Sequence, residues 1–155
     1  MLKDVDYKPV YVTGLSEPQE FFLDSLANSI KLDLCLGFFR TSGIRSLAAG
    51  FAIFIHNGGK LRLIMNDEMN LDDKEAIIRG EVGYEDEYFD NIISKNIKEL
   101  FSTLNRSDKI FYNCISWLIS HGEIEIKAIV PAKNKRGIAH QKFGIFYDEI
   151  GRAHV

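Results

Sequence analysis

Three consecutive residues near the end of the chain, His140, Gln141 and Lys142, include the side chains best suited to chemistry. If residues 138–147 form a strand, side chains two apart share a face, so His140 and Lys142 project together. A neutral imidazole can attack phosphorus, while a neighbouring ammonium stabilises charge on the non-bridging oxygens. The pair therefore suggests a phosphate-handling site. The alternative is a half-buried strand with a hydrogen-bonded histidine and a lysine that reaches solvent.

The charge around this pair differs from that of the whole chain. Residues 127–147 contain no acidic residue, although the formal net charge of the protein is −3. Lys133, Lys135 and Arg136 lie in this stretch, and we expect them to guide a phosphate backbone by charge without reading bases. The overall charge argues against a non-specific nucleic-acid coat and is compatible with a local phosphate site.

The elements that must position the pair follow from hydrophobic patterning. Residues 32–39 are almost continuously apolar, which predicts a strand buried on both faces. A helix over residues 42–55 and a strand over residues 60–65 follow, and this unit is expected to be a right-handed crossover between parallel strands. Ser42 begins the helix after the strand, where its amide and the helix dipole could bind an anion. Otherwise Ser42 is simply a helix cap.

The remaining segments complete an α/β prediction. A capping box at residues 16–19 starts a helix that runs to about residue 31. Further helices are predicted over residues 72–79, 90–104 and 108–120, with Ser107 as a possible cap for the last of them. Residues 123–130 read as a strand, and residues 131–137 form a basic turn into the strand over residues 138–147. We predict a mixed, largely parallel sheet covered by helices in αβα layers, truncated at the carboxyl end.

The motif and two upstream segments resemble the phospholipase D superfamily. His140-Gln141-Lys142 is similar to its His-x-Lys-x4-Asp motif, with Tyr147 at the expected acid position and Asp148 as the nearest acid. Residues 34–43 and 57–64 look like the first strand–helix–strand of versions attached to helicases and restriction-type proteins. The resemblance covers roughly residues 20–148.

This resemblance implies a phosphodiesterase or nuclease acting on nucleic acid, without metal or cofactor. His140 would be the nucleophile that forms a phosphohistidine, or its acid partner, while Lys142 would clamp the phosphate and Asp148 would orient a histidine. A second His-x-Lys motif is required, from a missing carboxyl-terminal part or from a homodimer. The alternatives are a catalytically degenerate module that docks DNA or a protein partner, and a plain α/β scaffold.

Length and composition favour one domain, which we place at residues 1–148. Residues 150–155 resemble a translated sequencing adapter, so residues 149–155 are interpreted as a non-native tail and the natural reading frame is expected to continue. Cys35 and Cys114 form no CxxC pair, which favours reduced thiols and the cytoplasm. No apolar run is long enough to span a bilayer, so no membrane partner is expected.

Overall fold

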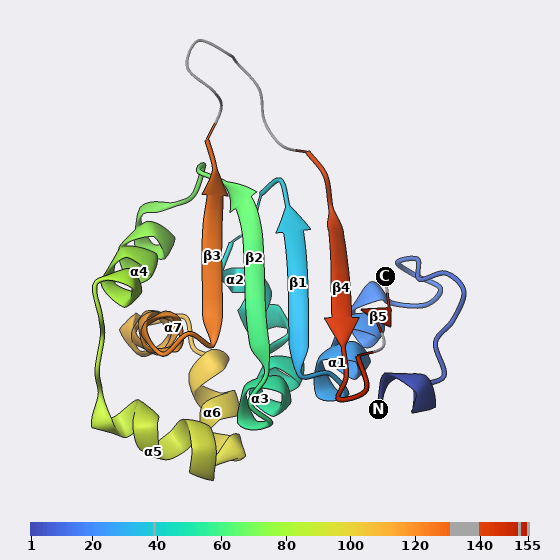
Figure 1. Ribbon diagram of the computed structural model, residues 1–155, viewed down its shortest axis with the longest axis horizontal. Coiled ribbons are helices and arrows are strands. Elements are labelled where there is room, and N and C mark those ends of the chain that lie inside the picture. The colour runs from blue at the N-terminus through green and yellow to red at the C-terminus, as the bar shows by residue number, and fades with distance from the viewer. Residues whose placement is uncertain (39, 131–139, 152, 155) are drawn as a thin grey trace.

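A five-stranded mixed sheet lies at the centre of the computed structural model, which describes residues 1–38, 40–130, 140–151 and 153–154 (Figure 1). The strand order is β3-β2-β1-β4-β5. The three neighbouring parallel strands are β1 (Lys31–Leu36), β2 (Lys60–Asn66) and β3 (Ile124–Ile129). The antiparallel members are β4 (Phe143–Tyr147), which pairs with β1, and the short β5 (Ala153–His154). The predicted mixed, largely parallel sheet is confirmed.

Helices cover this sheet, as predicted, but on one face rather than in the expected αβα layers, and their boundaries also differ from the sequence expectation. They are the 3-10 turn η1 (Leu2–Asp4) and the α-helices α1 (Pro18–Ala27), α2 (Ser42–Ser46), α3 (Ala48–His56), α4 (Leu71–Glu81), α5 (Glu87–Lys95), α6 (Ile97–Leu104) and α7 (Lys109–Ser120). The helix expected over residues 42–55 is broken at Leu47, whose φ is −111° and ψ is 21°. The helix expected over residues 90–104 is interrupted at Asn96, whose side chain caps α6 through the amide of Glu99.

Two predicted helix caps are corrected by local hydrogen bonds. Glu17 is the N-cap of α1 and makes no side-chain cap bond, while the Ser16 hydroxyl donates to the Val10 carbonyl instead. Asp108, rather than Ser107, caps α7 by accepting from the amide of Ile110. These differences arise because the competing acceptors and donors are only a few residues apart, and sequence pattern alone does not rank them.

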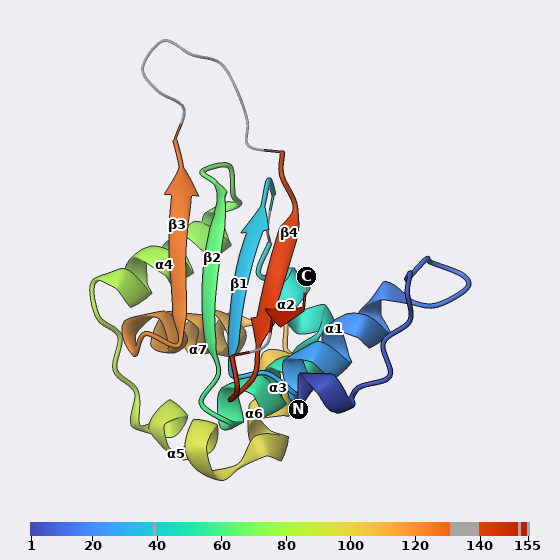
Figure 2. The ribbon, with the colours of Figure 1, turned by 45° about the vertical axis from the view of Figure 1, so that its right-hand side comes forward.

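The described helices lie on one face of the sheet and leave the opposite face open (Figures 1 and 2). Alternation along β2 shows the division: Leu61, Leu63 and Met65 are buried against the helices, whereas Arg62 and Ile64 are exposed. Residue Asp33 of β1 pairs in register with Arg62 and shares this open face. The prediction of a β1 strand buried on both faces is therefore wrong for the part of the chain that the structure describes.

Candidate functional site

His140, Gln141 and Lys142 immediately precede β4, and all three are exposed. Because β4 runs antiparallel to β1, its beginning lies at the carboxyl ends of the parallel strands (Figure 1). Phe143 is directly opposite Cys35, so Lys142, the residue before β4, lies beside the end of β1. The carboxyl edge of an open α/β sheet is where such folds gather ligands.

His140 and Lys142 lie before a strand and not within one, contrary to the sequence expectation. The strand begins at Phe143 and not at residue 138, so strand alternation does not set the directions of His140 and Lys142. Both side chains nevertheless reach solvent at the same edge. Within the described ranges, neither side chain forms an ion pair or a hydrogen bond. The imidazole and the ammonium are therefore accessible to an anionic ligand.

A buried carboxylate organises the neighbouring loops at this edge. Asp73, in the first turn of α4, is 2% exposed and accepts hydrogen bonds from the Thr41 hydroxyl and from the Thr41 amide at 3.4 Å. The Asn70 side-chain amide donates to the same carboxylate at 2.9 Å, and Asn70 in turn caps the amide of Asp73. This Asp73–Thr41–Asn70 clamp ties the loop after β1 to the loop after β2.

The clamp was not predicted from the sequence. Its two ends, Thr41 and Asp73, lie 32 residues apart in the chain, so no local pattern links them. Beside the clamp, a hollow of about 460 Å³ is lined by Phe38, Arg40, Glu68, Met69 and Asn70. The exposed Arg40 brings a second cationic side chain, besides that of Lys142, to this edge.

Ser42 does not have the predicted capping role. Thr41 is the N-cap of α2, and Ser42 is the exposed first residue of a helix of only five residues. The Thr41 hydroxyl is directed to Asp73 and makes no cap bond within α2. Such a short helix contributes little dipole, and the anion-binding role expected of Ser42 stays a prediction.

Asp148 lies at the opposite end of β4 from the His-x-Lys pair. It follows Lys142 by six residues, which at about 3.3 Å per residue corresponds to roughly 20 Å. Asp148 is buried, and its Oδ1 accepts from the Ile150 amide at 3.1 Å in the turn towards β5. Asp148 therefore lies too far along β4 to orient His140, and its Oδ1 contact closes the turn. That Asp148 orients another histidine stays a prediction.

The predicted basic loop residues Lys133, Lys135 and Arg136 lie outside the described residues. Lys127, at the other end of the acid-free stretch, is on β3, and its ammonium pairs with Glu125 at 2.8 Å. The Lys127 hydrogen bond lowers the pKa of the Glu125 carboxyl below its usual value.

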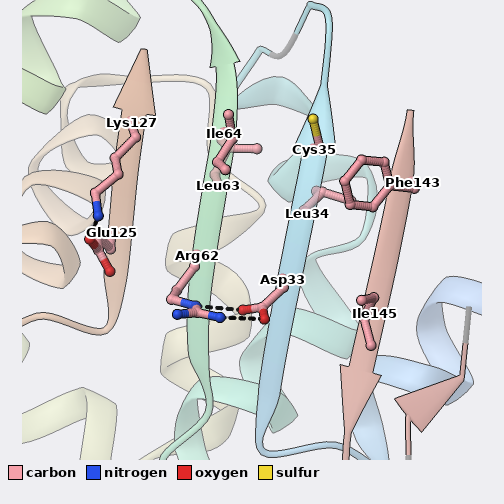
Figure 3. Close-up of a pocket in the computed structure, with 10 residues that line it drawn as sticks. All are labelled: Asp33, Leu34, Cys35, Arg62, Leu63, Ile64, Glu125, Lys127, Phe143 and Ile145. Atoms are coloured by element: carbon pink, nitrogen blue, oxygen red, sulfur yellow. Dashed lines mark hydrogen bonds and ion pairs between the residues drawn. The ribbon is translucent and has the colours of Figure 1, made fainter. Parts of the chain in front are cut away.

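The open face of the sheet contains a second hollow, of about 270 Å³, that spans four strands (Figure 3). Asp33 and Arg62 form a bidentate ion pair across its middle, with Arg62 Nε 2.6 Å from Asp33 Oδ1. Lys31 Nζ lies 3.3 Å from the same carboxylate. Hydrogen bonding from Arg62 first, and then the interaction with Lys31, lowers the pKa of Asp33 despite partial burial.

Comparison with models of known protein families, with curated proteins and with solved structures gives no match for this chain. Within the described ranges, no helix has the length and apolar character needed to cross a bilayer. The same part of the chain brings no three His, Cys, Asp or Glu side chains together in a group that could hold a metal ion.

Replacing Thr41 should disrupt the clamp, whereas replacing its neighbour should not. Thr41→Val removes the hydroxyl donor to a buried carboxylate, so we expect the free energy of unfolding to fall by about 1–3 kcal/mol. The matched variant Ser42→Ala should change it by less than about 0.5 kcal/mol. Urea unfolding of the two variants measures this. Equal effects of the two substitutions would show that the clamp does not stabilise the loop.

Protonation of Asp33 should remove the contribution of its ion pairs to the stability of the fold. Because its pKa is lowered in the folded state, the stabilisation is complete above the unfolded pKa, near 4, and is lost as the pH falls through the lower folded value. Asp33→Asn should therefore lower the melting temperature at pH 7, with the deficit shrinking below about pH 4. The exposed Asp6→Asn is the matched control. A deficit in melting temperature that stays constant across this pH range would show that the charge of Asp33 does not stabilise the fold.

Proposed function

We propose that this chain supplies one half of a phosphodiesterase site that acts on nucleic acid. The observation that supports it most directly is the joint exposure of His140 and Lys142 at the carboxyl edge of the parallel strands. An accessible imidazole provides a nucleophile, and the adjacent ammonium stabilises the anionic phosphorane-like transition state. The resemblance to the phospholipase D superfamily gives the reaction type.

The proposed chemistry proceeds in two displacements. A ring nitrogen of His140 forms a bond to phosphorus while the phosphorus–oxygen bond to the leaving group breaks, and the leaving oxygen takes the electron pair. A second His-x-Lys motif, in cis or from another copy, protonates that oxygen. Water then attacks the phosphohistidine, which releases a phosphate monoester and regenerates the imidazole. Lys142 contacts the non-bridging oxygens in both steps.

A catalytically degenerate docking module is the second candidate function. Asp148 favours it, because the nearest match to the motif acid lies at the far end of β4 and contacts a turn. In this alternative the edge would bind the phosphates of DNA without cleaving them. We place either activity in the cytoplasm, a proposal supported by the free thiols of Cys35 and Cys114, which are both buried.

An activated diester tests the half-site without a second motif. Bis(p-nitrophenyl) phosphate has a leaving group that needs no protonation, so the wild-type chain should release about one p-nitrophenolate per His140 site and retain an acid-labile phosphoryl adduct. His140→Asn should abolish both signals, and Lys142→Ala should slow the release by about 10²-fold or more. Nitrophenolate absorbance and mass spectrometry of the intact protein measure these outcomes.

The matched control is His56→Asn, at the carboxyl end of α3, which should leave adduct formation unchanged. An unmodified wild-type chain that still binds an oligonucleotide through Lys142 would select the docking module. Neither an adduct nor Lys142-dependent binding would overturn both candidate functions.

A further inference from the structure

The open face of the sheet is organised in two rows of side chains that run across the strands (Figure 3). Strand register sets Phe143, Cys35, Ile64 and Lys127 side by side in one row. The next row contains Ile145, Asp33, Arg62 and Glu125 in the same order. An aromatic ring thus stands at one end of the first row and an ammonium at the other, about 14 Å apart across three strand spacings.

We propose that this face binds single-stranded nucleic acid, with an unpaired base stacked on Phe143. The inference rests on the proposed function, because it takes nucleic acid as the ligand and names its strandedness. The Phe143 side chain is 50% exposed, and its ring borders the hollow on the open face. Base stacking on an exposed aromatic side chain requires an unpaired base, since bases within a duplex already stack on their neighbours.

Position along the chain connects this ring to the candidate phosphate site. Phe143 directly follows Lys142, so a strand whose phosphate lies at Lys142 reaches the ring with an adjoining base. From there the bound nucleic acid can continue over Cys35 and Ile64 towards Lys127. An aromatic platform joined to a cationic path is the arrangement by which proteins hold single strands.

Charge on the face also suits a polyanion. In the two ion pairs that lie in these rows the cation is the more exposed partner: Arg62 is 54% exposed against 19% for Asp33, and Lys127 is 72% exposed against 51% for Glu125. The carboxylates are therefore partly shielded while the guanidinium and the ammonium face solvent. Arg62 uses Nε and one terminal nitrogen for Asp33, which leaves its other terminal nitrogen for a ligand.

The same pattern disfavours a packed protein helix. A helix lying along the strands needs apolar contacts over several residues of each strand. On this face the apolar row is followed at once by the charged pair Asp33 and Arg62. This charged pair interrupts the apolar surface along β1 and β2, which suits a planar ring better than a helix.

Oligonucleotide binding by the intact chain tests the proposal. In fluorescence anisotropy, Phe143→Ala should weaken binding of a labelled single-stranded oligothymidylate by about tenfold, while Phe143→Trp should preserve it. Phe101→Ala, which removes a comparably exposed ring from α6, should have no effect. Binding of a duplex of the same length should be indifferent to Phe143→Ala. Thermal unfolding of each variant establishes that it is folded.

Equal affinity of the Phe143→Ala and Phe101→Ala variants for the single strand would overturn the inference. If Lys142→Ala still weakened binding in that case, the proposed phosphate site would survive on its own. Self-association that is abolished by Phe143→Ala, without oligonucleotide binding, would instead make the face a contact between copies and would also overturn the proposal. The adduct experiment with His140→Asn tests the proposed phosphodiesterase reaction and is independent of single-strand binding at Phe143.

Discussion

The antiparallel pairing of β4 with β1 is the constraint on which the candidate site depends. It places Phe143 opposite Cys35 and Tyr147 opposite Lys31, so the start of β4 meets the end of β1. A parallel β4 would have brought Asp148 to the carboxyl edge and left His140 at the other end of the sheet. The loops after β1 and β2 reach the same edge because their strands are parallel, and the Asp73–Thr41–Asn70 clamp holds these two loops together.

The two faces of the sheet have different roles in this account. The helix-covered face contains the hydrophobic core, from Leu32 and Leu61 on the strands to Phe54 and Phe111 on the helices. The charged groups of the open face are paired, by Lys31–Asp33 within β1, by Lys127–Glu125 within β3 and by Arg62–Asp33 between β2 and β1, and they remain compatible with water. Strand alternation therefore separates the side chains that stabilise the fold from those available to a ligand.

Local patterns predicted most of the elements but few of the contacts between them. The apolar run at residues 32–39 correctly predicted β1, yet Asp33 within it faces the open side. Whether helices cover one face of the strand or both cannot be read from the strand's own residues. The periodicity of residues 108–120 predicted α7 closely. Asp73 could not be linked to Thr41, because tertiary structure alone brings the two loops together. His140 and Lys142 were placed together for a reason that does not hold, since the strand starts after them, although both do lie at one exposed edge.

Amide chemical-shift mapping with inorganic phosphate tests most directly whether the carboxyl edge binds a phosphoryl group. Titration of the ¹⁵N-labelled chain should produce saturable shifts centred on residues 140–142 and on the loop after β1, including Arg40 and Thr41. The turn at Asp148 should remain unperturbed. Saturable shifts centred on that turn, or an absence of saturable shifts at residues 140–142, would contradict the account.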